Sequence, residues 1–402
     1  MDALVFKGKY AIAFERVPAP RLEQPGDVIV RIELCGLCGS DLHPYHCREE
    51  GLDEGTVMGH EFVGRVVTAG PEVQRFNPGD RVMSPFTANC GDCFYCRRGL
   101  TARCERSQLF GWVEGGKGLH GAQAQFIRVP MADATLALVP ADVSDEEALL
   151  LGDIFSTGFF AADNAGIAAL AASYGAASGD GAASGAAGSG AAGADAVAAG
   201  GQLNGEQHAS EAGPVVAVVG CGPVGVLACI GARELGAARV FAIDSVPERL
   251  ALAARFGAEP LNREQAATGG RGADAVLEVV GAPSALRSAY NLVRPGGTIS
   301  SVGCHTAPGF PFSPTDCYNK NVTLKSGRCS ARHYMGRLLP LVQSKKYDIA
   351  AIISHRLPLS EGPAAYRLFD GKAGGCTKVV MRPWPATAAA AEGAAAAGEQ
   401  GA

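Results

Sequence analysis

The chain has 402 residues, which predicts two domains, each large enough for a hydrophobic core of its own. Its net charge of −5 argues against an electrostatic surface for nucleic acid or membranes, and the sequence contains no apolar run long enough to span a bilayer. The 13 cysteines, together with a β-type opening at residues 1–6 that is unlike a signal or transit peptide, favour a reducing compartment, by default the cytosol.

The N-terminal part of the chain is rich in short β-forming runs. They lie at residues 28–32, 62–67 and 80–83, and turn-forming Pro-Gly-Asp triplets precede or overlap them at 25–27 and 78–80. Many short strands with turn residues between them predict a small barrel-like β domain.

Four cysteines follow in the pattern C-x2-C-x2-C-x7-C, namely Cys90, Cys93, Cys96 and Cys104. Such short spacings let one loop surround a single cation, and four thiolates complete the tetrahedral coordination of zinc. A closed coordination sphere leaves no open position for a substrate, so we interpret this run as a structural zinc site. Disulfides are the alternative, which the expected reducing compartment disfavours.

Residues 168–213 are dominated by alanine, glycine and serine, and contain no aromatic residue after Tyr174. Alanine favours helix, but the interspersed glycines destabilise it, and little apolar surface is available to offset the loss of chain entropy. We therefore expect a flexible insertion loop here, with a docking element as the alternative. The segment 385–402 has a similar composition, and we expect a disordered tail.

The pattern changes after the insertion. An apolar run at 215–219 suits a strand buried on both faces, and further strands are expected at 239–243, 275–280 and 298–302, with helical segments between them. Alternation of strands and helices predicts a parallel, doubly wound sheet.

A glycine-rich turn connects the first of these strands to its helix. It reads G-x-G-x-x-G and comprises Gly220, Gly222, Pro223, Val224 and Gly225. The first glycine permits a tight turn, the second lets the backbone approach a pyrophosphate, and the third allows close packing of helix on strand. The free N–H groups at the start of the helix attract an anion, so the turn predicts a dinucleotide site.

Asp244 ends the next strand, where this fingerprint has an acidic residue that accepts hydrogen bonds from the adenosine ribose. Its charge would repel a 2′-phosphate, which favours NAD(H) over NADP(H). The alternative is that Asp244 caps the following helix. Arg249 either flanks the same ribose or is an exposed helix residue.

The segment 35–43 reads Cys-Gly-Leu-Cys-Gly-Ser-Asp-Leu-His, and Gly59, His60 and Glu61 follow it. With the four-cysteine run and the later glycine-rich turn, this order of motifs resembles the zinc-containing medium-chain alcohol dehydrogenase family. The resemblance covers nearly the whole chain outside the insertion and the tail. Its motifs are specific in combination, although each is weaker alone.

The resemblance implies a catalytic zinc held by Cys38, His60 and Asp153. A thiolate and an imidazole are good zinc ligands on independent grounds. At the third place the family usually has a cysteine, and the aspartate here resembles the glutathione-independent formaldehyde dehydrogenases. A carboxylate is a competent ligand but leaves zinc harder than a second thiolate would, so this departure puts the substrate in doubt and not the reaction.

The resemblance also suggests roles for other side chains of the site. Glu61 would lie beneath the metal, with a solvated strand residue as the alternative, and Ser40 and His43 would carry the substrate proton to solvent, unless His43 is only a surface loop histidine. Thr157 would pack beside the nicotinamide. Phe86 is either a substrate-pocket aromatic or a core residue, and Lys378 either contacts the pyrophosphate or is a solvated strand lysine.

The expected fold class is α/β. A GroES-like β-rich catalytic domain comprises residues 1–158 and 330–384, and a Rossmann NAD-binding domain comprises residues 159–329. The expected cofactors are two zinc ions per subunit and NAD(H), and the expected reaction is reversible oxidation of a primary or secondary alcohol to an aldehyde or ketone.

Several alternatives stay open within and outside this family. A polyol, threonine or formaldehyde dehydrogenase is the first, and a zinc-free quinone reductase or a non-catalytic NAD- and zinc-binding protein is disfavoured. The expected partner is a small alcohol or aldehyde, with no nucleic acid and no membrane. By the resemblance we expect a homodimer or homotetramer.

Overall fold

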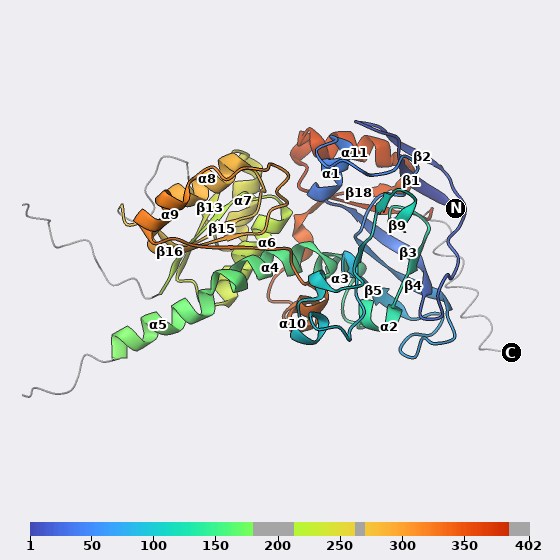
Figure 1. Ribbon diagram of the computed structural model, residues 1–402, viewed down its shortest axis with the longest axis horizontal. Coiled ribbons are helices and arrows are strands. Elements are labelled where there is room, and N and C mark those ends of the chain that lie inside the picture. The colour runs from blue at the N-terminus through green and yellow to red at the C-terminus, as the bar shows by residue number, and fades with distance from the viewer. Residues whose placement is uncertain (180–212, 262–269, 386–402) are drawn as a thin grey trace, which may run out of the picture.

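The computed structural model describes residues 1–179, 213–261 and 270–385. Two sheets organise the chain and occupy the two halves of Figure 1. The first is mostly antiparallel, with the order β11-β5-β4-β3-β19-β18 and β10 also paired to β3. Its strands are β3 (Val28–Leu37), β4 (Phe62–Ala69), β5 (Arg81–Met83), β10 (Phe126–Val129), β11 (Ala137–Leu138), β18 (Ile353–Pro358) and β19 (Lys378–Arg382).

The first sheet joins segments from both ends of the chain. β19 pairs antiparallel with β3, so that Val379 lies opposite Leu37 and Met381 opposite Cys35. Small ribbons and short helices surround this sheet: β1 (Asp2–Phe6), β2 (Ile12–Arg16), β6 (Thr87–Ala88), β7 (Gln108–Leu109), β8 (Trp112–Glu114), β9 (Lys117–Leu119), α1 (Leu42–Tyr45), α2 (Ala132–Thr135) and α11 (Gly362–Asp370). The pairing brings the C-terminal strand beside the segment that leads to Cys38.

The second sheet is parallel throughout, with the order β14-β13-β12-β15-β16-β17. Numbered within this sheet the order is 3-2-1-4-5-6, which is that of a Rossmann fold. The strands are β12 (Val215–Val219), β13 (Arg239–Ile243), β14 (Glu259–Pro260), β15 (Ala273–Glu278), β16 (Val293–Ser301) and β17 (Thr323–Ser326). The predicted α/β fold class, a GroES-like part with a Rossmann part, is confirmed.

Four helices that follow strands of the parallel sheet begin with a proline, which fixes the backbone for the first turn without wasting a hydrogen-bond donor. They are α6 (Pro223–Glu234), α7 (Pro247–Arg255), α8 (Pro283–Leu292) and α9 (Pro314–Lys320). Four further helices are α3 (Asp145–Gly152), α4 (Ile154–Ala165), α5 (Ile167–Gly179) and α10 (Ala331–Gln343), and α5 extends away from the body of the molecule in Figure 1.

One hydrophobic core runs from the first sheet through α3 and α4 to α6 and the parallel sheet. Helix α4 lies between the two halves in Figure 1 and approaches α6 closely. A Cβ atom at Gly158 would lie 2.7 Å from the Ala228 nitrogen, and one at Gly231 would lie 2.9 Å from the Phe159 Cα. Small residues at this crossing therefore fix the position of α4, whose first turn carries the candidate site.

The expected flexible loop is wrong for its first part, because residues 168–179 belong to α5. The helix is anchored where it begins: Ile167 is buried, and the Tyr174 hydroxyl donates to Asp274 Oδ1 at 2.9 Å. These contacts and the high helix propensity of alanine outweigh the glycines. The rest of the predicted insertion, 180–212, and the tail 386–402 lie outside the described residues.

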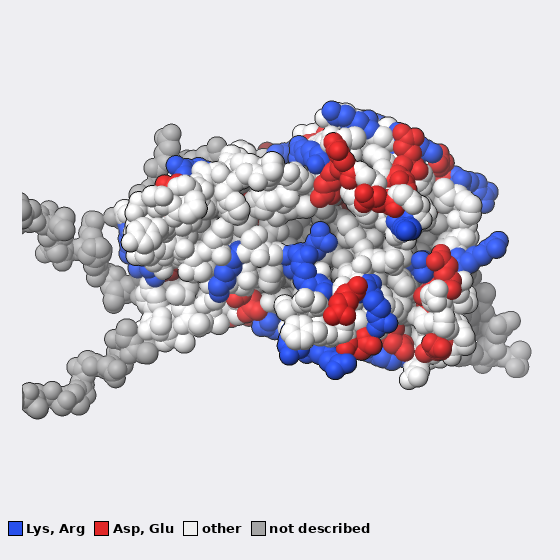
Figure 2. Space-filling model, viewed as in Figure 1, with Lys and Arg blue, Asp and Glu red and all other residues white. Residues whose placement is uncertain are grey.

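Across the described ranges, no single helix has the length and apolar character needed to cross a bilayer. One helix pair, Ile154–Ala165 with Ile167–Gly175, meets that test jointly, but it is bent by 46°. Positive and negative side chains are interspersed over the half of the surface that covers the first sheet (Figure 2).

Candidate active site

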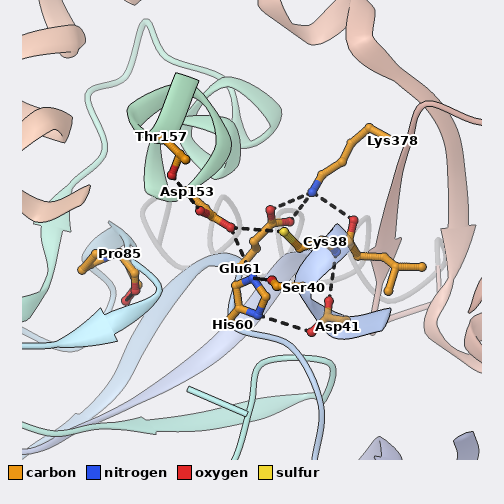
Figure 3. A network of polar contacts seen from close by, with 12 residues as sticks. Cys38, Ser40, Asp41, His60, Glu61, Pro85, Asp153, Thr157 and Lys378 are labelled. Atoms are coloured by element: carbon orange, nitrogen blue, oxygen red, sulfur yellow. Dashed lines mark hydrogen bonds and ion pairs between the residues drawn. The ribbon is translucent and has the colours of Figure 1, made fainter. Parts of the chain in front are cut away.

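The site begins at the end of β3, where the strand passes into a short 3-10 helix, Gly39–Asp41. Cys38 stands at this junction, and its backbone N–H donates to Asp41 Oδ2 at 2.9 Å. The turn therefore fixes both the thiol and a carboxylate, and Figure 3 shows them on the same short segment.

His60 lies just before β4, and its ring nitrogens contact the side chains of Asp153, Ser40 and Asp41. Its Nε2 is 3.2 Å from Asp153 Oδ2 and 3.3 Å from the Ser40 hydroxyl, while its Nδ1 is 3.3 Å from Asp41 Oδ1. Burial lowers the pKa of His60, but the Asp41 and Asp153 carboxylates outweigh it, so that the pKa lies well above its ordinary value. The imidazole is thus oriented from both ring nitrogens.

Asp153 is the residue at which one helix ends and the next begins. Its φ of −141° and ψ of −77° break the helical path between α3 and α4, and the carboxylate points at Cys38, whose thiol donates to Oδ2 at 3.5 Å. The Thr157 hydroxyl, one turn along α4, donates to the other carboxylate oxygen at 3.3 Å. The helix break therefore presents Asp153 to the cluster.

Glu61 and Lys378 form a buried ion pair beside the cluster. The Lys378 ammonium donates to both Glu61 oxygens, to Oε1 at 2.7 Å, and to the Leu37 carbonyl at 3.0 Å. Burial lowers the pKa of Lys378, yet the Glu61 carboxylate more than compensates and raises it. A Cβ at Gly36 would lie 1.8 Å from Glu61 Oε2, so only glycine leaves room for this carboxylate. The solvated alternatives for Glu61 and Lys378 are wrong, because both side chains are buried.

The donor set fits zinc. One ligand atom from each of Cys38, His60, Glu61 and Asp153 lies within 4.8 Å of the others. The Cys38 sulfur and an Asp153 oxygen approach to 3.5 Å, and both would be negative when ionised. Burial raises the pKa of the Cys38 thiol, and the Asp153 charge raises it further. A divalent cation among these groups would remove that repulsion, and sulfur, nitrogen and oxygen are the donors that zinc accepts.

The four cysteines of the second cluster also converge. Their sulfurs lie within 4.8 Å of one another, with Cys104 Sγ 3.4 Å from Cys90 Sγ. Backbone N–H groups point at the sulfurs, for example that of Cys96 at Cys93, and such donors lower the pKa of Cys93 to about 6. None of the 13 cysteines forms a disulfide. The arrangement fits a closed four-thiolate zinc site.

The glycine-rich turn has the geometry that the sequence predicts. Gly220 has φ of +94°, and a Cβ at Gly225 would lie 1.8 Å from the Gly220 carbonyl oxygen, so neither position accepts a side chain. A Cβ at Gly222 would have Arg249 Nη1 as its nearest neighbour, at 3.8 Å. The turn is therefore tight at its two ends and open in the middle, as a bound pyrophosphate requires.

Asp244 supports this turn from the end of β13. Its Oδ2 accepts a hydrogen bond from the Cys221 N–H at 2.7 Å, and its Oδ1 accepts one from the Val246 N–H at 2.9 Å. Arg249 Nη1 lies 3.9 Å from the same carboxylate. The helix-cap alternative is wrong, because α7 begins at Pro247 and Val246 occupies the cap position. The exposed alternative for Arg249 is wrong too, since its side chain is mostly buried.

A cleft of about 990 Å³ connects the cluster around Cys38 with the glycine-rich turn. It opens between the halves of the molecule, and Figure 2 shows the surface hollowed there. The predicted residues that line it are Cys38, Ser40, His43, His60, Phe86, Asp153, Thr157, Gly222, Pro223, Val224, Gly225, Arg249 and Lys378. Phe86 also belongs to the hydrophobic core, so both of its expected roles fit its place.

Comparison with known proteins agrees with this architecture. Residues 24–141 match the family model of the alcohol dehydrogenase GroES-like domain, and residues 223–344 match that of the zinc-binding dehydrogenases. A zinc-type alcohol dehydrogenase B of Aspergillus flavus is 37% identical over 380 residues, which cover 92% of this chain and 79% of that protein. A medium chain reductase/dehydrogenase of an Acremonium species is 44% identical over 328 residues, covering 79% and 98%.

The solved structure of an alcohol dehydrogenase from Thermus sp. ATN1 is also similar, with a TM-score of 0.78 and 37% identity over 95% of this chain and 99% of that one. The chain belongs to the zinc-containing medium-chain alcohol dehydrogenase family. It is a zinc-dependent oxidoreductase of alcohols, and its cofactors are zinc and NAD(H).

Asp41 of this dehydrogenase, which was not predicted as a site residue, contacts His60 at the ring nitrogen away from Asp153. Gln123 Nε2 donates a hydrogen bond to Asp41 Oδ2 at 3.2 Å, and the Tyr366 hydroxyl donates one to Gln123 Oε1 at 2.9 Å. A metal-binding histidine usually donates its other ring N–H to a carboxylate, which is the signal that could have found it. The ion pair of Lys378 with Glu61 was missed as well, because these residues are 317 positions apart.

Proposed function

We propose that the dehydrogenase holds its catalytic zinc with Cys38, His60 and Asp153, and oxidises a primary or secondary alcohol reversibly with NAD. The observation that supports this most directly is the convergence of a thiol, an imidazole and a carboxylate at the floor of the cleft that also contains Gly222. When bound there, zinc supplies Lewis acidity at the substrate hydroxyl and NAD supplies the hydride acceptor.

The chain's own residues would orient these groups and move a proton. Asp41 fixes the ring orientation of His60, and Lys378 neutralises Glu61 beside the ligands. The Ser40 hydroxyl lies in the cleft near the ligands and is placed to accept the substrate proton, and His43 would pass it to solvent. Thr157 would contact the nicotinamide ring and steady Asp153. Asp244 would favour NAD(H) over NADP(H) by repelling a 2′-phosphate.

The cysteine cluster at residues 90–104 would hold a second, structural zinc. We also propose a homodimer or homotetramer in the cytosol. The family resemblance supports the oligomer, and 13 cysteines without a disulfide are in keeping with a reducing compartment. Light scattering of the purified protein would test the assembly.

The test is a panel of alcohols and aldehydes with NAD and NADP, run on protein whose zinc content has been measured. Asp153→Asn should lose one zinc equivalent and nearly all activity, because a neutral amide is a poor zinc ligand. Asp153→Cys, with the ligand that the family usually has, should keep the zinc and shift the substrate preference. If Asp153→Asn kept both its zinc and its turnover, the proposed ligand set would be wrong.

A further inference from the structure

A third group of metal-ligating side chains lies in the cleft, separate from the two clusters described above. His43, Glu49 and Cys304 offer a nitrogen, an oxygen and a sulfur that all lie within 4.8 Å of one another. The Cys304 Sγ is 3.6 Å from Glu49 Oε1. His43 comes from α1 and Glu49 from the segment after it, whereas Cys304 follows β16 of the parallel sheet. The group therefore spans the two halves of the molecule.

The geometry of this group suits a small cation. Zinc bonds of about 2.0–2.3 Å place tetrahedral ligand atoms roughly 3.3–3.8 Å apart, so the sulfur and the oxygen are already at a suitable separation. The third donor, which lies within 4.8 Å of the other two, would have to move by about 1.5 Å at most. His43 has a ring nitrogen to spare, because its buried Nδ1 has no hydrogen-bond partner among the described residues. All three side chains are partly exposed, which leaves a path for an ion from solvent.

The charges around the group favour a weaker site than the four-cysteine cluster or the cluster of Cys38, His60 and Asp153. Glu49 and an ionised Cys304 would balance a divalent ion, but the positive charges of Arg48 near His43 and Arg328 near Cys304 oppose it. Three protein ligands also leave a fourth position for water. An ion held in this way exchanges with solvent, unlike a resident structural metal.

We propose that His43, Glu49 and Cys304 form an exchangeable zinc site that reversibly inhibits the dehydrogenase. Binding takes His43 away from the proton path, and for this consequence the inference rests on the proposed function of that residue. It also ties the segment after β16 to the segment after α1 across the cleft that contains the proposed zinc ligands and Gly222. The thiol proton of Cys304 is released to the buffer as its sulfur binds the ion.

The experiment measures zinc binding to the holoenzyme after its resident zinc has been quantified. The enzyme is dialysed against buffers of fixed free Zn²⁺, and bound zinc and alcohol oxidation are measured together. We expect one further equivalent per subunit, with inhibition following its uptake. Cys304→Ser and Glu49→Gln should each weaken the binding of this further zinc, and the inhibition that follows it, by roughly tenfold or more. Cys47→Ser is the matched control, because this exposed thiol lies two residues before Glu49, and it should bind zinc as the unaltered protein does.

A second measurement does not depend on activity. Cd²⁺ added to the zinc-replete enzyme should produce the ultraviolet absorption of a thiolate–cadmium bond, and this signal should be absent in Cys304→Ser but present in Cys47→Ser. The proposal is overturned if no further equivalent binds, or if Cys304→Ser is inhibited and absorbs like the unaltered protein. Failure of the proposed function would look different, because the unsupplemented enzyme would then oxidise no alcohol.

Discussion

The four-cysteine cluster and the proposed catalytic cluster of Cys38, His60 and Asp153 are assembled in opposite ways. The cysteine cluster takes all its sulfurs from residues 90–104, so a single loop brings them together. The catalytic cluster takes its donors from the end of β3, the start of β4 and the break between α3 and α4. The first can form as soon as its loop closes, whereas the second exists only when the sheet and the connecting helices are packed.

The donors differ as much as the assembly does. Four thiolates complete the coordination of zinc and leave no position for a substrate, so such a site can stabilise a loop but cannot take part in catalysis. The catalytic cluster mixes sulfur, nitrogen and oxygen, lies buried at the floor of a cleft, and has the Glu61–Lys378 ion pair beside it. On the proposed assignment, the reactive metal site is the one whose geometry depends on long-range packing.

Loss of a catalytic ligand should abolish turnover and leave the cysteine cluster intact. Cys38→Ser should lower kcat/KM for alcohol oxidation by about 10⁴-fold, or about 5 kcal/mol, because the substrate hydroxyl loses its Lewis acid. Zinc analysis should find that one equivalent is lost and the other retained. Full zinc content with normal turnover would show that Cys38 is not a ligand.

Replacing one partner of the buried ion pair should lower stability more than replacing both partners. Lys378→Met leaves the Glu61 carboxylate buried without a counter-charge and should lower the free energy of unfolding by about 4 kcal/mol. The double variant Lys378→Met/Glu61→Gln should recover part of this loss, as urea denaturation can measure. Lys117→Met, at an exposed lysine of β9, is the control and should change little. Equal losses in the single and double variants would contradict a coupled pair.

Loss of the structural cluster should lower stability without removing the catalytic zinc. Cys93→Ser should decrease the melting temperature by roughly 5 °C, since the loop at residues 90–104 loses its cross-link while the main core is unchanged. Thermal unfolding followed by circular dichroism, with zinc analysis of the folded protein, checks both points. Cys317→Ser, at a cysteine outside the metal-ligating groups, should melt like the unaltered protein.

The proton path should give the smallest and most pH-dependent effect. Burial lowers the pKa of His43, so the imidazole is neutral at pH 7 and able to accept a proton. Alcohol oxidation should therefore rise with pH through this lowered pKa and then level off. His43→Gln should remove that limb and slow oxidation by roughly tenfold at neutral pH, with recovery in alkaline buffer. His355→Gln, on β18, should keep the profile of the unaltered protein; an unchanged profile in His43→Gln would exclude the relay.

The features of this protein that could be predicted from its residues alone are local in origin. The spacing of Cys90, Cys93, Cys96 and Cys104 lies within one loop, and the Gly220–Gly225 turn is set by which backbone positions can accept a Cβ atom. The parallel sheet could also be predicted locally, because each strand and each helix shows its own hydrophobic periodicity in the sequence. The ligand assignments of Cys38, His60 and Asp153 came from resemblance, and the structure brings these side chains together.

Other features of the site depend on tertiary packing. Asp41 behind His60, Lys378 beside Glu61 and the group of His43, Glu49 and Cys304 each depend on contacts between segments far apart in the chain. Helix α5 was missed because its anchors, Ile167 in the core and Tyr174 on Asp274, are tertiary contacts that composition does not reveal. Spacing fixes geometry over a few residues, whereas the direction of a side chain across a cleft follows from how the sheets and helices pack.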